Sequence, residues 1–142
     1  MNTKIGNVSN YLASLILLSM GLIYIFKSSF MPYHSAAVMQ EWDEINLEFQ
    51  SLILALMRAV SGGYIAMAIT VAVMQKKFSS TKVSWLPPLM LIAGLIVSLT
   101  SIYATLIVRF NTPGEPPTAL AIAGIVLLLI GYAFNRRSLS EE

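Results

Sequence analysis

Four long apolar stretches alternate with short polar connections along the chain. They cover residues 8–26, 49–74, 86–108 and 118–134. Each holds about the 20 mostly apolar residues that a helix needs to cross roughly 30 Å of hydrocarbon. Because short connections join antiparallel neighbours, the pattern predicts an all-α membrane protein, an antiparallel bundle of four transmembrane helices. Residues 1–142 are expected to form this single domain.

The first connection, "KSSFMPYHSAAVMQEWDEIN", is long enough to hold structure of its own. Pro32 prevents the first helix from continuing. Beyond it, apolar residues recur at near-helical spacing, opposite amide and acidic residues. These apolar positions are Ala36, Val38, Met39, Trp42 and Ile45. We therefore expect a short amphipathic helix at the extracytoplasmic surface, with Trp42 and Tyr33 as interfacial anchors. Asn46 is expected to cap the second spanning helix.

Composition supports membrane insertion. Of 142 residues, 56% are hydrophobic and only 11% are charged, which is too little polar surface for a soluble domain of this size. The net charge of +2 does not indicate nucleic-acid binding, because the basic residues flank apolar stretches and build no polar face. With no cysteine in the chain, disulfides, thiolate metal sites and thiol nucleophiles are excluded.

The basic residues predict the orientation in the membrane. With four crossings, both termini and the middle connection share one side. That side carries Lys4, Lys76, Lys77, Lys82, Arg136 and Arg137. The other side carries Lys27 and Arg109. The positive-inside rule then predicts that both termini lie in the cytoplasm. The membrane we expect is the inner (plasma) membrane. The first apolar stretch is longer than a signal-peptide core and is expected to be retained.

Small and weakly polar residues recur at helical spacing in all four stretches. They are Asn10, Ser14 and Gly21 in the first, Ala55, Ala59 and Gly63 in the second, Gly94, Ser98, Ser101 and Thr105 in the third, and Ala121, Gly124 and Gly131 in the fourth. Lipid supplies no hydrophobic drive for helices to associate, so contact faces in membranes are marked by such residues. We expect the bundle to pack along these faces.

Arg58 lies about 13 Å inside Phe49 at 1.5 Å per residue. No Asp or Glu falls within the four stretches, so three accounts of this charge stay open. The guanidinium can snorkel outward or pair with Glu44 or Glu48 of the first connection. It can bind an anionic group together with Arg109, because a guanidinium matches carboxylate and phosphate in bidentate fashion. It can also meet an acidic residue of a partner protein.

The second account predicts a ligand site in the outer half of the bundle. Gly62 leaves space beside the guanidinium, and the Ser/Thr face of the third helix reaches a similar depth. The candidate ligand-binding residues are Arg58, Gly62, Ser98, Ser101, Thr105 and Arg109. The candidate outer cap over the bundle consists of His34, Glu41, Trp42, Asp43 and Glu44. One histidine beside carboxylates is not a metal-ligand set, and no catalytic motif, metal or cofactor is expected.

The segment "RAVSGGYIAMA", with Arg58, Gly62 and Gly63, together with the four-span layout, resembles the small bacterial inner-membrane proteins of the DoxX-like kind. That resemblance implies an accessory membrane protein, often acting beside an enzyme, and carries over no catalytic residue. We expect a non-enzymatic accessory or assembly subunit of a membrane complex. The alternative is a binder or oligomeric carrier of a lipid-like or small anionic ligand that uses Arg58.

The expected partners follow from these two readings. They are the lipid bilayer, a membrane-protein partner or second copy of the chain, and an anionic lipid-like ligand. An enzyme acting through His34 with Glu41 or Asp43 ranks behind both readings.

Overall fold

The computed structural model describes residues 2–140, and every regular element in that part of the chain is helical. The α-helices are α1 (Asn2–Phe26), α2 (Pro32–Val38), α3 (Leu47–Thr81), α4 (Leu86–Asn111) and α5 (Thr118–Leu139), and a short 3-10 helix covers Trp42–Glu44. All except α2 and the 3-10 helix are long and apolar enough to cross a membrane. The predicted helical membrane bundle is confirmed at this level.

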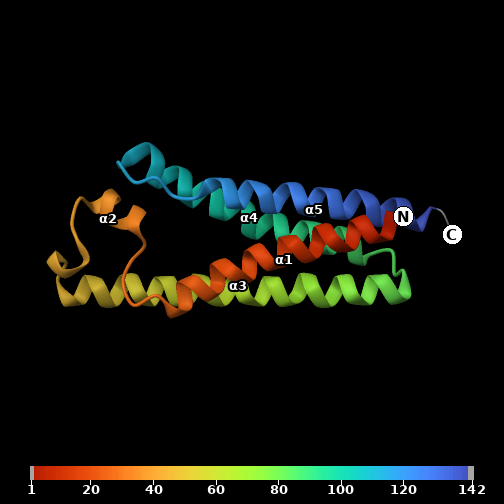
Figure 1. The fold of residues 1–142 in the computed structure, drawn as a ribbon, viewed down its shortest axis with the longest axis horizontal. Helices are drawn as coiled ribbons and strands as arrows, with labels where there is room; N and C mark the ends of the chain where they lie inside the picture. Colours follow the sequence, from red (N-terminus) through yellow and green to blue (C-terminus); the bar gives the residue numbers. More distant parts are fainter. Residues whose placement is uncertain (1, 141–142) are drawn as a thin grey trace.

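Successive long helices run in opposite directions, so both chain termini lie at one end of the bundle (Figure 1). We call this the terminal end, and the opposite end, which carries α2, the α2 end. Helix α1 packs against both α3 and α5, and α5 packs against α4, whereas the α3–α4 pair is packed most sparsely of these four. Toward the α2 end, α1 departs from α5, and α2 lies between the start of α3 and the α4–α5 turn.

The helices extend beyond the apolar stretches that predicted them. Helix α3 continues past residue 74 to Thr81, because a helix that has left the hydrocarbon still satisfies its own backbone groups. It ends where Lys82 adopts a left-handed conformation, with φ of 52°. At its start, the Asn46 side chain accepts a hydrogen bond from the Phe49 N–H at 2.9 Å, and Glu48 lies in the first turn. The predicted cap is confirmed.

The first connection contains a short helix, but not over the residues that the apolar spacing indicated. Helix α2 begins at Pro32, whose fixed φ suits a first helical position, and ends at Met39, which is left-handed with φ of 53°. Trp42–Glu44 then forms a separate 3-10 helix. The apolar positions between residues 36 and 45 therefore do not lie on one helix, because α2 ends among them and the 3-10 helix follows.

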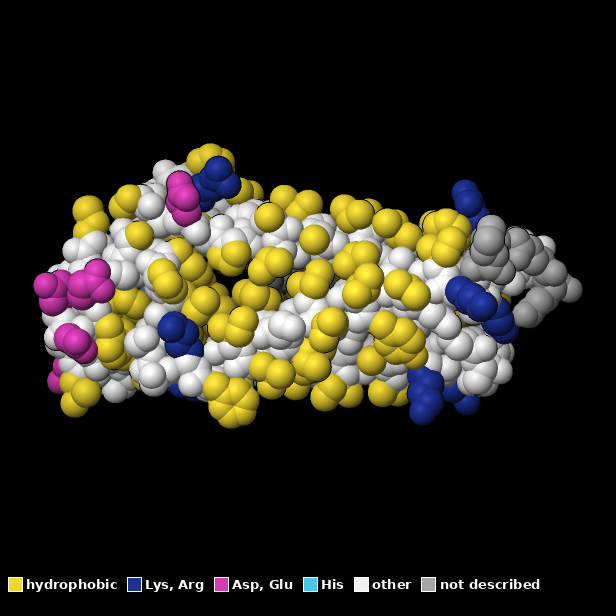
Figure 2. Space-filling view, in the orientation of Figure 1, with side chains coloured by type: hydrophobic (Ala, Val, Ile, Leu, Met, Phe, Trp, Pro, Cys, Tyr) yellow, Lys and Arg dark blue, Asp and Glu magenta, His cyan; other side chains and the backbone are white. Residues whose placement is uncertain are grey.

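Apolar side chains cover the middle of the molecule (Figure 2). Lysine and arginine side chains gather at the terminal end, and aspartate and glutamate gather at the α2 end. This distribution matches a helical bundle whose midsection faces lipid, because charged groups are costly within hydrocarbon.

Three of the four predicted packing faces are buried, and the one on α3 is not. Asn10 and Ser14 of α1 are buried, as are Gly94 of α4 and Gly124 and Gly131 of α5. On α3 the small residues Ala55, Ala59 and Gly63 are exposed. The buried positions of α3 are instead Met57, Ser61, Ala68, Val71, Gln75 and Phe78. The prediction for α3 was wrong because the glycine-rich face lies beside the true contact face, not on it.

A cluster of amide and hydroxyl side chains joins α1, α3 and α5 at the terminal end. This amide cluster consists of Asn7, Asn10, Gln75, Ser79 and Asn135. The carbonyl oxygen of Gln75 accepts from the Asn10 amide at 2.6 Å and from the Asn135 amide at 2.8 Å. The Gln75 amide donates to Asn7, and Ser79 Oγ donates to Asn7 Oδ1 at 2.8 Å. Gln75 and Asn135 are fully buried, so satisfied polar groups close this end of the bundle.

Candidate intramembrane ligand site

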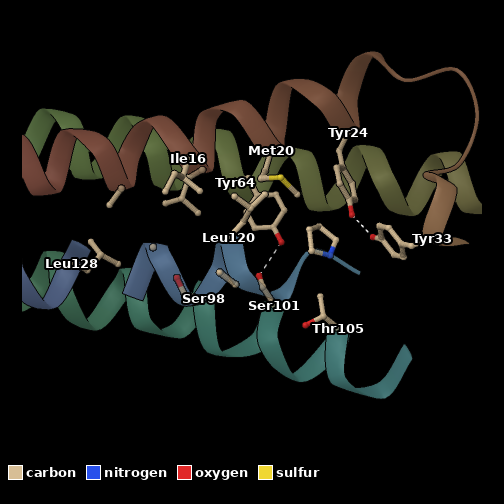
Figure 3. Close-up of a pocket in the computed structure, with 15 residues that line it drawn as sticks. Ile16, Met20, Tyr24, Tyr33, Tyr64, Ser98, Ser101, Thr105, Leu120 and Leu128 are labelled. Atoms are coloured by element: carbon tan, nitrogen blue, oxygen red, sulfur yellow. Dashed lines mark hydrogen bonds between the residues drawn. The ribbon is translucent and has the colours of Figure 1, made fainter. Parts of the chain in front are cut away.

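Hydroxyl groups from four helices converge on one cavity between the terminal-end core and α2 (Figure 3). The cavity has a volume of about 60 Å³. Ser98, Ser101 and Thr105 face it from α4, because spacings of three and four residues place side chains on one helical face. The tyrosines on the opposite side come from three elements and are Tyr24 of α1, Tyr33 of α2 and Tyr64 of α3.

The hydroxyls form two pairs across the cavity. Tyr64 and Ser101 meet at 2.8 Å between oxygen atoms. Ser101 also donates its proton to the Val97 carbonyl at 2.7 Å, so it accepts from Tyr64. At the α2 end of the cavity, the Tyr24 and Tyr33 hydroxyls are hydrogen-bonded to each other (Figure 3). Each hydroxyl oxygen can still accept from a further donor.

The remaining wall of the cavity is apolar and comes mainly from α1 and α5. It is formed by Ala13, Ile16, Leu17, Met20, Pro117, Leu120, Ala121, Gly124 and Leu128. None of the described residues that line the cavity is charged. Figure 2 shows a hollow between the helices on the visible, lipid-facing side of the bundle. The site can therefore accept a small uncharged polar group from the side.

Arg58 does not line this cavity. Its two terminal nitrogens donate to the backbone carbonyls of Tyr24 and Lys27, each at 2.6 Å. The Tyr24 carbonyl belongs to the last turn of α1 and the Lys27 carbonyl to the residue directly after it, where backbone C=O groups have no partner within the helix. The positive charge also lies at the negative end of the helix dipole. Arg58 therefore caps α1, and its bonds go to a helix end rather than to Glu44 or Glu48.

Only some of the other candidate ligand residues lie at the cavity. Ser98, Ser101 and Thr105 come together at the cavity, as their spacing predicted. Gly62 is exposed, and a side chain added there would meet nothing within 4 Å. Arg109 is exposed in the last turn of α4. These two residues and Arg58 do not form one site with the α4 hydroxyls.

The candidate outer cap lies at the α2 end as a packed segment with an acidic surface. Trp42 packs edge-on against Phe30, with ring centroids 5.0 Å apart. Glu41, Asp43 and Glu44 are exposed. Within residues 2–140 no group of three or more His, Cys, Asp or Glu side chains could hold a metal ion. The acidic residues therefore face solvent around an aromatic contact.

Helix α2 covers the α2 end of the cavity and is held on both sides. Besides the contact between Tyr33 and Tyr24, the backbone of Gly114 lies so close to the Tyr33 carbonyl that a side chain at position 114 would collide with it. Burial raises the pKa of the Tyr33 hydroxyl, and the bond with Tyr24 raises it further. Burial lowers the pKa of His34, whose Nδ1 accepts from the Met31 N–H at 3.2 Å.

Sequence reasoning missed two features of this region. The tyrosines of the cavity could not be linked from the sequence, because Tyr24 lies near the end of its apolar stretch, Tyr64 lies in the middle of its own and Tyr33 lies outside all four stretches. The amide cluster could have been found from the spacing of amide and hydroxyl residues. Asn7 and Asn10 lie three apart, as do Asn135 and Ser138, and Gln75 and Ser79 lie four apart.

No family model, curated protein or solved structure matched the chain.

Proposed function

We propose that this protein is a membrane-embedded binder of an uncharged, lipid-like molecule. The observation that carries the proposal is the convergence of paired hydroxyls from α1, α2, α3 and α4 on one otherwise apolar cavity. Ligand sites of this kind are mostly apolar, with a few polar groups that orient the ligand. A hydroxyl or amide group of the ligand would donate a hydrogen bond to Tyr64 or Ser101, because the protons of these two hydroxyls already have acceptors.

The volume of the cavity limits what enters it. About 60 Å³ corresponds to roughly two water molecules at about 30 Å³ each. That space accommodates the polar end of a molecule and leaves the apolar remainder outside. Because the described lining residues carry no charge and Arg58 is engaged at the end of α1, the proposed ligand is uncharged rather than anionic.

Removal of one hydroxyl tests this proposal. The protein would be released from its own membranes into native mass spectrometry as wild type and as Ser101→Ala. We expect wild type to carry an additional lipid-like mass that the variant loses. The matched control is Ser51→Ala, because Ser51 is exposed and donates to a carbonyl four residues earlier, as Ser101 does. Bare wild-type protein, or equal loss of the mass in both variants, contradicts the proposal.

A second function, that of a non-enzymatic accessory or assembly subunit, is favoured by the exposed small residues of α3. Ala55, Ala59, Gly62, Gly63 and Ala66 face outward. Small residues allow close approach of helix backbones in membranes, so this face suits another transmembrane helix. The resemblance of this segment to DoxX-like proteins supports the same function.

Thiol crosslinking tests the accessory function, because the chain has no cysteine of its own. A cysteine at Gly63 is expected to crosslink in native membranes to one discrete protein. A cysteine at Ile92, which is exposed on α4, serves as the control and is expected to remain uncrosslinked. Equal or absent crosslinking at the two positions contradicts this function.

We further propose a bacterial inner-membrane location, with the terminal end in the cytoplasm. The basic residues gathered at that end support this orientation (Figure 2). In this orientation α2 and the 3-10 helix form a cap at the extracytoplasmic surface, with Tyr33 and Trp42 at headgroup level.

A further inference from the structure

Helix α3 extends further toward the α2 end of the bundle than α1 does. Arg58 bonds to the end of α1, so α1 ends at about the level of Arg58. Helix α3 begins at Leu47, and this overhang of α3 measures about 16 Å at 1.5 Å per residue. A helix end at this depth leaves carbonyls in apolar surroundings, where each unsatisfied group costs several kcal/mol. The guanidinium satisfies two of them, and α1 can end there.

Beside the overhang lies an apolar groove with a volume of about 360 Å³. Its lining comes from α3, from α2 together with Phe30, and from single residues of α1 and α4. The lining residues are Tyr24, Phe30, His34, Ala37, Val38, Ile53, Leu56, Met57, Val60 and Val108. Among these described residues only His34 can become positively charged, and burial favours its neutral form by lowering its pKa.

The lining chemistry selects hydrocarbon over water. The volume equals that of about a dozen waters at roughly 30 Å³ each, but a buried water needs two to four polar partners. The His34 ring and the Tyr24 hydroxyl are the polar groups among the described lining residues, and two groups are too few to hold a dozen waters.

One side chain borders both the groove and the hydroxyl-lined cavity. Tyr24 contributes to the lining of each. Its ring packs edge-on against Tyr64, with centroids 6.3 Å apart, and its hydroxyl is bonded to Tyr33. The cavity and the groove are therefore adjacent spaces on the two sides of a single tyrosine.

We propose that the groove binds the hydrocarbon chain of the same molecule whose polar end occupies the cavity, with the chain passing Tyr24. The inference rests on the proposed ligand-binding function and names the ligand class. The ligand is a single-chain amphiphile with an uncharged polar end, such as a long-chain alcohol or amide. The small cavity admits only its polar end, and the larger apolar groove takes its chain.

Two photoactivatable forms of hexadecanol test this arrangement with the full chain in phosphatidylcholine vesicles. One form carries a diazirine beside the hydroxyl, and the other carries it at the methyl end. Labelled residues are located by mass spectrometry, with and without excess unmodified hexadecanol. We expect the hydroxyl-end probe to label residues 98–105 and the methyl-end probe to label residues 53–60 and position 108, both in competition with hexadecanol.

A bulky side chain in the groove completes the test. Val60→Trp fills the groove, and we expect the labelling that hexadecanol competes to be lost for both probes, because the indole occupies the space of the chain. Val73→Trp is the matched control, because Val73 lies on the same helix, is 60% exposed and lines none of the described spaces. Leu56→Trp provides a second groove variant should Val60→Trp fail to fold.

The outcomes separate this inference from the proposed function. Labelling of residues 98–105 that persists in both groove variants overturns the groove as the chain site and leaves the function standing. Failure of the methyl-end probe to label the groove has the same meaning. Labelling that hexadecanol does not compete, or that spreads evenly over exposed positions, reflects bilayer contact and overturns both. Competed labelling that both groove variants lose supports both.

Discussion

Replacing Arg58 by leucine provides a direct test of how a charge is accommodated within an apolar helix. In the structure the guanidinium makes two hydrogen bonds of 2.6 Å to the end of α1. The leucine side chain is apolar, like the side chains around it, but it has no hydrogen-bond donor. The Tyr24 and Lys27 carbonyls would then lose their partners where little water can replace them. We therefore expect Arg58→Leu to lower the free energy of unfolding.

The size of this loss follows from the two bonds. A hydrogen bond to a charged group contributes about 1.5–3 kcal/mol, which gives about 3–6 kcal/mol for the pair. Hydrogen bonds between helices in membranes average only about 0.6 kcal/mol, so we expect the lower end, about 3 kcal/mol. Arg58→Lys retains the charge but not the planar fork, and should recover about half of the loss. Both variants should also loosen α1 from α3 at the α2 end.

Unfolding in mixed micelles of dodecyl maltoside and dodecyl sulfate, followed by far-ultraviolet circular dichroism, measures these differences. Arg109→Leu is the control, because Arg109 is exposed in the last turn of α4, where its interaction with the helix dipole is worth about 0.3–1 kcal/mol. A buried charge without adequate partners would be relieved by leucine. An Arg58→Leu variant as stable as wild type, or more stable, therefore refutes the capping role.

Two further predictions concern packing and pH. A methyl group at Gly131 would overlap the Asn10 amide, whereas the space beside Gly62 is open. Gly131→Ala should therefore lower the melting temperature by several degrees, and Gly62→Ala should leave it unchanged or raise it. Equal effects of the two changes would contradict the described packing. Burial lowers the pKa of His34, so its neutral form stabilises α2 above the ordinary value of about 6.5 and this contribution is lost as the pH falls below it. The protection factors of the amides of residues 32–38, which correct for the slower intrinsic exchange at low pH, should fall between pH 7.5 and pH 5 in wild type but not in His34→Gln, and an identical fall in that variant would assign the effect to another group.

The spanning helices and their order could be predicted because each depends on a local property of the chain. A long apolar stretch must form a helix in hydrocarbon, where every backbone group needs an internal partner. The α4 hydroxyls could also be placed together, because Ser98, Ser101 and Thr105 share one face by spacing alone. Asn46 could be identified as a cap from its position before an apolar helix.

The features that were missed depend on how helices lie beside one another. Small residues at positions 55, 59 and 63 of α3 suit a contact face as well as Ser61 and Ala68 do, and only the partner helix selects between them. The partner of Arg58 is a pair of backbone carbonyls, which no residue type reveals. These carbonyls could be identified only from the position of the end of α1 relative to Arg58 on α3. The α4 side of the cavity could be predicted from spacing, whereas its tyrosines and the groove depend on how α1, α2 and α3 lie beside one another.

The amide cluster has a consequence for what can open the terminal end of the bundle. Asn7, Asn10, Gln75, Ser79 and Asn135 contain no ionisable group, so neither a proton gradient nor a change in pH alters their bonds. They also carry no net charge on which a transmembrane voltage could do work, whereas one elementary charge moved through 100 mV changes the energy by about 2.3 kcal/mol. The amide cluster itself therefore senses neither pH nor voltage, and any such response of the terminal end has to come from charged groups around it, such as Lys82, which donates hydrogen bonds to Thr3 and Ser138.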